Sequence, residues 1–106
     1  MDRNKPLSRQ QFKKTIQIGV SLVDFNAPWC APCIAQKPIV DQLAKLYAGK
    51  ASVIEINVDG NQQSAMDLGI TSIPTLIIYK NGVEIERFIG LQNAQVLSAA
   101  IDKALA

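Results

Sequence analysis

Two cysteines three residues apart are the groups in this chain best suited to do chemistry. Cys30 and Cys33 are the only cysteines among 106 residues, and they follow Trp29 directly. Side chains at positions i and i+3 share one face of a helix, so the two thiols can close and reopen a disulfide. A static bridge across so short a loop would remove little chain entropy. The pair therefore predicts reversible redox chemistry rather than a structural crosslink or two inert core thiols.

The residues around the pair predict how the two thiols divide the work. Disulfide exchange needs a thiolate, and a cysteine with a pKa of about 8.5 is only about 3% ionised at pH 7. An apolar strand, a short turn and then a helical pattern place Cys30 at a helix N-terminus, where free N–H groups and the dipole lower its pKa. Pro32 suits the first helical turn. We expect Cys30, the more exposed thiol, to attack a substrate disulfide, and Cys33 to resolve the mixed disulfide.

A carboxylate inside an apolar run is the second informative feature. Asp24 lies within residues 20–25, which read as a buried strand, where a carboxylate is costly. One interpretation is an acid at the end of the strand whose side chain reaches water. The other is a desolvated acid with a raised pKa that exchanges protons with Cys33.

Composition and charge argue against several other classes of function. The net charge is only +2 and the basic residues are scattered, so we expect no nucleic-acid partner. Histidine is absent, and two cysteines cannot complete a usual zinc site, so we expect no metal. No glycine pattern resembles a phosphate cradle, and we expect no cofactor. Apolar runs are too short for a membrane span, and residues 1–14 lack the apolar core of a signal peptide, so we expect a cytoplasmic protein without a membrane partner.

The pattern of apolar residues predicts four strands. The strands are expected over residues 20–25, 51–58, 75–79 and 83–89, the first two buried and the last with one wet face. Asn81 and Gly82 predict a hairpin between the last two. Alternation of strand and helix in the early part predicts parallel pairing. The expected fold class is therefore α/β, with a central mixed sheet of four to five strands and helices on both faces.

Capping residues and helical spacing predict the helices. Ser8 and Gln11 resemble a capping box that starts a first helix, and Asn93 can cap the last one. Apolar residues at helical spacing predict a long helix over residues 33–47, in which Pro38 should cause a kink. A short helix is expected over residues 62–68.

Taken together, these motifs resemble the thioredoxin family. The matching residues, at the family's spacings, are Val23-Asp24-Phe25, Trp29-Cys30-Ala31-Pro32-Cys33, Pro38, Ile73-Pro74-Thr75, Asn81-Gly82 and Gly90. The resemblance covers nearly the whole chain and implies a single thioredoxin domain over residues 1–106. It also implies a protein-disulfide reductase that carries electrons through a Cys30/Cys33 cycle and receives them from a thioredoxin reductase, with no cofactor of its own.

The resemblance further implies a docking surface around the cysteine pair. Pro74 would be a cis-proline facing the cysteines, and the backbone of Ile73 would pair with an extended substrate segment as an added strand. The residues of this surface would be Trp29, Ala31, Pro32, Ile73, Pro74, Ile89 and Gly90. A packed core position is the competing interpretation for Trp29. We expect the protein to act as a monomer on disulfide-containing protein substrates.

Several residues depart from the family's usual pattern. Ala31 and Ser72 stand where the family usually has glycine, and Asn26 stands where it usually has tryptophan. Ala31 favours helix over glycine by about 1 kcal/mol and adds a methyl group to the docking surface. The short N-terminal segment predicts that the family's first edge strand is reduced or lost.

Glu55 is the departure with the largest chemical consequence. It replaces a lysine that in the family lies near the buried acid, and a second carboxylate near Asp24 would raise the pKa of one of the two. Lys37 lies four residues after Cys33, on the same helix face. We predict that Lys37 supplies the missing cation beside Glu55 and Asp24. The alternative is that Lys37 and Glu55 both point to solvent.

The sequence leaves open a second function from another class. A thioredoxin-fold scaffold could be a binding module that docks a partner through its apolar rim, with redox turnover incidental. The retained cysteines argue against this alternative.

Overall fold

A computed structural model describes residues 8–106 of the chain. These residues form one four-stranded sheet in the order β2-β1-β3-β4. Its strands are β1 (Val20–Asn26), β2 (Ala51–Asn57), β3 (Thr75–Lys80) and β4 (Val83–Ile89). β1 pairs parallel to β2 and antiparallel to β3, and β3 pairs antiparallel to β4. The predicted mixed sheet is confirmed. The prediction about an N-terminal edge strand falls partly on residues 1–7, which lie outside the described residues.

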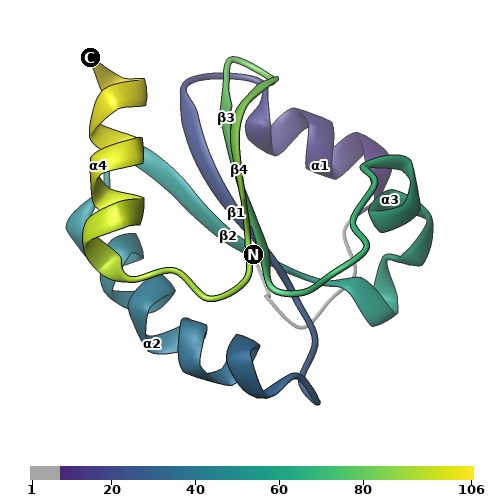
Figure 1. Cartoon of the computed structure of the whole chain (residues 1–106). Helices are drawn as coiled ribbons and strands as arrows, with labels where there is room; N and C mark the ends of the chain where they lie inside the picture. Colours follow the sequence, from purple (N-terminus) through teal and green to yellow (C-terminus); the bar gives the residue numbers. More distant parts are fainter. Residues whose placement is uncertain (1–7) are drawn as a thin grey trace.

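Helices cover both faces of this sheet (Figure 1). On one face lie α2 (Ala31–Leu46) and α4 (Ala94–Leu105), and on the other α1 (Arg9–Ile16) and α3 (Gln62–Asp67). A short 3₁₀ helix, η1 (Val58–Gly60), connects β2 to α3. The helix α2 links the parallel strands β1 and β2, because a parallel pair needs a crossover connection. Cys30 and Cys33 therefore lie where β1 ends and this crossover begins.

The alternation of side chains along β1 and β3 divides the core into two layers. Successive residues of a strand point to opposite faces of the sheet. The layer under α2 and α4 includes Val20, Leu22, Leu76 and Ile78, and the layer under α1 includes Val23, Phe25, Ile77 and Tyr79. By this alternation Asp24 belongs to the face that α2 covers.

Local hydrogen bonds begin the helices where the sequence predicted. The Ser8 hydroxyl accepts from the Gln11 N–H at 3.0 Å while the Gln11 side chain accepts from the Ser8 N–H at 2.8 Å, a complete capping box. Asn93 caps α4 by accepting from the Val96 N–H at 2.8 Å. The predicted hairpin turn is present as well, with positive φ at Asn81 and Gly82.

Two predictions about the strands are wrong. The strand β2 was expected to be buried, but it forms an edge of the sheet, and only Ile56 among its residues is buried. The strand β4 forms the other edge, and its residues are exposed or half-buried on both faces rather than on one. A strand at an edge has one neighbour instead of two, which an apolar run does not reveal. The helix α2 begins directly after its N-cap residue Cys30, as predicted from the placement of Cys30 and Pro32. The predicted kink at Pro38 stays a prediction.

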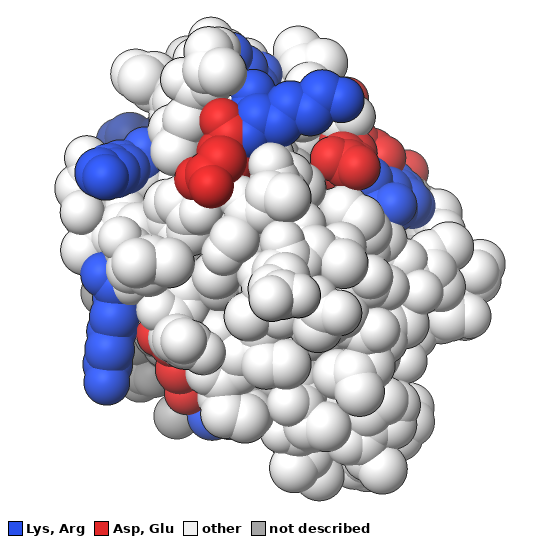
Figure 2. Space-filling model, turned by 60° about the vertical axis from the view of Figure 1, so that its left-hand side comes forward, with Lys and Arg blue, Asp and Glu red and all other residues white. Residues whose placement is uncertain are grey.

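Charged side chains are unevenly distributed over the surface. The face that carries α2 and α4 has an uncharged area across its centre, with charged side chains towards its margins (Figure 2). The sequence explains this distribution, because residues 25–36 and 88–101 contain no Asp, Glu, Lys or Arg. These two uncharged stretches include the cysteine pair and the start of α4.

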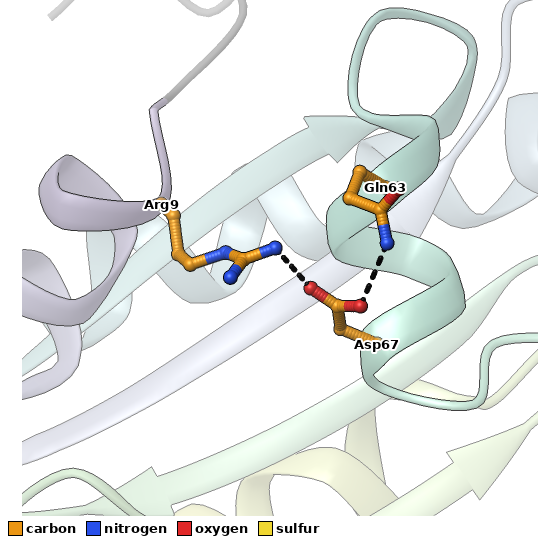
Figure 3. A network of polar contacts seen from close by, with 3 residues as sticks. All are labelled: Arg9, Gln63 and Asp67. Carbon is orange, nitrogen blue, oxygen red and sulfur yellow. Dashed lines mark hydrogen bonds and ion pairs between the residues drawn. The ribbon is translucent and has the colours of Figure 1, made fainter.

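An exposed ion pair connects α1 to α3 on the opposite face (Figure 3). Arg9 donates to one carboxylate oxygen of Asp67, and Gln63 donates to the other at 2.8 Å. Both charged side chains are largely open to water. Such a pair contributes at most about 1 kcal/mol to stability.

Candidate active site

A disulfide joins Cys30 and Cys33 at the N-terminus of α2, with their Cα atoms 5.2 Å apart. Cys30 is the N-cap residue, and its sulfur accepts a hydrogen bond from the Cys33 backbone N–H at 3.3 Å. This N–H is one of the donors that have no partner within the helix. After reduction the same donor and the helix dipole favour negative charge on the Cys30 sulfur.

Both cysteines are nearly covered in this oxidised form. Cys30 is 5% exposed and Cys33 4%, so the predicted difference in exposure is almost absent. Ala27, Val58 and Ile73 pack against the pair, and the Ile73 carbonyl oxygen lies 3.7 Å from the Cys30 sulfur. A substrate disulfide that reaches the Cys30 sulfur therefore comes close to the backbone of Ile73.

The residues of the predicted docking surface surround this approach. The Ile73–Pro74 peptide bond is cis, as the resemblance implied. Trp29 is 69% exposed, which excludes the core interpretation, and its indole N–H donates to Asp59 at 2.9 Å. The other members differ in exposure: Ala31, Pro32 and Ile89 are exposed, Ile73 and Gly90 are half-buried, and Pro74 is buried.

The surface extends beyond the residues predicted from the sequence. A groove of about 390 Å³ runs beside Trp29 and Ile73, and the exposed side chain of Met66 in α3 lines it. Leu91, half exposed, follows the predicted residue Gly90 directly. Met66 carries no sequence signal, because its position depends on how α3 packs. Leu91 could have been found as an apolar residue next to a predicted site residue.

Asp24 is fully buried, which excludes the interpretation of a strand-end acid that reaches water. One carboxylate oxygen accepts from Asn26 at 3.2 Å, and the other has no hydrogen-bond partner. Burial raises the pKa of Asp24 from 3.8 to about 7. The Asn26 hydrogen bond and the charge of Lys37 lower this pKa, and the charge of Glu55 raises it.

Glu55 and Lys37 meet on the face of the sheet to which Asp24 belongs. Glu55 is the register partner of Asp24 on β2, so both side chains lie on the face that α2 covers. The Lys37 Nζ lies 3.7 Å from a Glu55 carboxylate oxygen and 3.5 Å from one of Asp41. The Glu55 side chain is only 12% exposed, whereas that of Lys37 is 56% exposed. The structure thus brings Lys37 and Glu55 together rather than turning both to solvent.

A cavity of about 500 Å³ lies beside this group. Its lining includes Cys33, Lys37 and Glu55, so one opening joins the second thiol to the charged pair. Pro38 is exposed and lies outside this lining. The cavity therefore lets a proton pass through water between Cys33 and the Glu55 carboxylate, whereas Asp24 is not part of its lining.

Residues 8–106 lack two other kinds of feature. They contain no cluster of three or more histidine, cysteine or acidic side chains able to hold a metal ion. None of their helices combines the length and the apolar character that crossing a membrane requires.

Known proteins match this fold and this site. The thioredoxin family model matches residues 3–103. Thioredoxins of Staphylococcus haemolyticus and Staphylococcus aureus (strain Mu50) are 42% and 39% identical to this chain over 94 residues, covering 89% of it and 90% of each relative. A solved structure of a mutant thioredoxin from Halobacterium salinarum has a TM-score of 0.87 at 31% identity, covering 100% of this chain and 96% of that one. Thioredoxin from Malassezia sympodialis has a TM-score of 0.84 at 34% identity, covering 93% and 89%.

The chain belongs to the thioredoxin family. Its fold is the thioredoxin fold, as the sequence motifs implied. The family and the Cys30–Cys33 pair at a helix N-terminus make it a thiol–disulfide oxidoreductase that reduces protein disulfides.

Proposed function

We propose that this chain acts in the cytoplasm as a monomeric, single-domain reductant of protein disulfides and is itself reduced by a thioredoxin reductase. The observation that carries the proposal is the Cys30 sulfur at the N-terminus of α2, held by the Cys33 N–H. The chain has no glycine pattern for a nicotinamide or flavin, so the two electrons must come from a separate protein.

In the first step, the Cys30 thiolate attacks one sulfur of a substrate disulfide. The substrate S–S bond breaks, a Cys30–substrate S–S bond forms, and the departing substrate thiolate takes a proton. The exposed side chains of Trp29 and Ile89 in the docking surface contact the substrate segment that carries the disulfide, and the Ile73 backbone aligns this segment as an added strand.

In the second step, Cys33 resolves the mixed disulfide. The Cys33 thiol gives its proton to Asp24 by way of the Glu55 carboxylate, which lines the same cavity as Cys33, and attacks the Cys30 sulfur. The Cys30–Cys33 bond forms and the Cys30–substrate bond breaks. The second substrate sulfur leaves as a thiolate that takes a proton from water, and the substrate has gained two electrons. Asp24 suits this role because a base with a pKa near 7 is efficient at neutral pH.

Lys37 and Glu55 tune Asp24 in this proposal. The charge of Glu55 raises the pKa of Asp24, and that of Lys37 lowers it. A lysine on α2 and a glutamate on β2 thus replace the lysine that the family usually carries on the strand. The positive charge of Lys37 offsets the negative charge of Glu55, so that Asp24 can still lose its proton near neutral pH.

Turnover of a protein disulfide tests the proposal. Purified protein, a bacterial thioredoxin reductase and NADPH should reduce the disulfides of insulin, with NADPH consumption as the readout. Cys30→Ser and Cys33→Ser should each abolish turnover, and only Cys33→Ser should accumulate the mixed disulfide. Full cellular function of a Cys30→Ser/Cys33→Ser double variant would instead support the binding-module alternative.

A further inference from the structure

Gln36 is a buried polar side chain that the reaction described above does not use. It lies one turn after Cys33 in α2 and is fully buried. A primary amide is costly to bury unless both its donor and its acceptor are satisfied. Gln36 meets this condition with a single partner residue, Gln92 in the loop between β4 and α4. Its Nε2 donates to the Gln92 carbonyl at 3.0 Å, and its Oε1 accepts from the Gln92 N–H at 2.8 Å.

These two hydrogen bonds attach α2, the helix that carries Cys33, to the loop that contributes Gly90 to the docking surface. The loop of residues 90–92 passes beside α2 (Figure 1). The Gln92 side chain donates to the Gly90 carbonyl at 3.2 Å, and the Gly90 N–H donates to the Pro74 carbonyl at 2.8 Å. One chain of hydrogen bonds therefore runs from Gln36 through Gln92 and Gly90 to Pro74.

The loop has few other means of fixing its position. Leu91 within the loop is 50% exposed, and Ile89, which precedes the loop in β4, is 64% exposed. The surrounding stretch carries no charge, so a substrate gains no long-range electrostatic attraction here (Figure 2). The affinity for a substrate then depends on how well residues 90–92 are held in place before the substrate binds.

We propose that Gln36 is a positioning residue that holds residues 90–92 ready for protein substrates. The proposal rests on the disulfide-reductase function given above and adds a determinant of substrate affinity to it. Both side-chain hydrogen bonds of Gln36 go to Gln92, and neither goes to a cysteine sulfur. Gln36 therefore acts on docking and not on thiol exchange.

The test compares a large substrate with a small one. Methionine has nearly the length and volume of glutamine but lacks its amide, so Gln36→Met removes both hydrogen bonds. We expect KM for insulin to rise five- to tenfold with kcat within twofold. The rate with the small aromatic disulfide 5,5′-dithiobis(2-nitrobenzoate), which needs no extended docking, should stay within twofold. Gln10→Met on the exposed face of α1 is the matched control and should change neither rate.

Equal loss of rate with both substrates, or an unchanged KM for insulin, would overturn the proposal. Amide hydrogen exchange supplies a readout that does not depend on activity or on folding of the variant. In the unsubstituted protein the Gln92 N–H should exchange at least tenfold more slowly than an unprotected loop amide, and exchange at the unprotected rate would also overturn the proposal. If the unsubstituted protein reduced neither insulin nor the small disulfide, the proposed reductase function would be wrong. Amide exchange at Gln92 would still show whether Gln36 holds the loop in place.

Discussion

Replacing the buried Asp24 by asparagine should stabilise the protein in a pH-dependent way. The folded-state pKa of about 7 lies above the value of 3.8 for an exposed aspartate. The protonated acid therefore contributes stability that is fully present below about pH 4. That stability is lost as the pH rises and is gone above about pH 7. Asparagine cannot ionise, so Asp24→Asn avoids this loss.

The size of the effect follows from the pKa difference. A difference of about three pKa units corresponds to about 4 kcal/mol above pH 7.5. We therefore expect a gain of about 2 to 4 kcal/mol. The gain should grow by at most about 1.4 kcal/mol per pH unit between pH 4.5 and 6.5 and level off above pH 7.5.

Denaturant unfolding of the oxidised protein between pH 4.5 and 8.5 measures this gain. The variant and the unsubstituted protein should differ little in free energy of unfolding at pH 4.5 and most at pH 8.5. Glu86→Gln removes a carboxylate from an exposed site and is the matched control, which should show no pH-dependent gain of this size. A free-energy difference for Asp24→Asn that is constant over the whole pH range would refute the reasoning about a desolvated carboxylate.

Three further perturbations test other parts of the structure. Lys37→Met should raise the pKa of Asp24, because it removes the cation beside Glu55, and NMR titration of the Asp24 carboxyl carbon measures the shift. The reduced protein should react with iodoacetamide at Cys30 several-fold faster at pH 6 to 7 than a small free thiol does, since the helix N-terminus favours the thiolate. Arg9→Ala should lower the free energy of unfolding by less than about 1 kcal/mol in a denaturant titration, because its ion pair is exposed.

Each of these expectations has an outcome that contradicts it. Lys45→Met, at the far end of α2, is the control for Lys37→Met, and equal titrations of Asp24 in the two variants would remove Lys37 from the site. Alkylation of Cys30 no faster than that of the free thiol would contradict thiolate stabilisation. A loss above about 2 kcal/mol in Arg9→Ala would mean that the contact between α1 and α3 is more than a surface ion pair.

The features predicted correctly from the sequence depend on residues close together in the chain. The capping box at Ser8 and the cap at Asn93 join residues three positions apart. The turn at Asn81 and Gly82 requires positive φ at two adjacent residues, which this residue pair tolerates well. The cysteine pair belongs to the same group, because one helical turn brings both sulfurs together.

The features that the sequence did not reveal depend on contacts between distant segments. An apolar run does not show whether a strand has one neighbour or two, so the edge position of β2 was missed. The covering of Cys30 by Ile73 joins segments 43 residues apart. The pairing of Gln36 with Gln92 joins residues 56 apart, and a glutamine within a helical pattern carries no sign of such a partner.

By itself the sequence determined the helices and most strand positions, the family and the two sulfurs that exchange electrons, because short-range spacing and hydrogen bonding specify them. Only the tertiary structure decided what surrounds those sulfurs. The register of β1 against β2 places Glu55 beside Asp24, and the packing of α2 brings Lys37 to Glu55, where its charge lowers the pKa of Asp24. The ionisation of a buried acid depends on the solvent and the charges that long-range packing places around it, and these cannot be read from neighbouring residues along the chain.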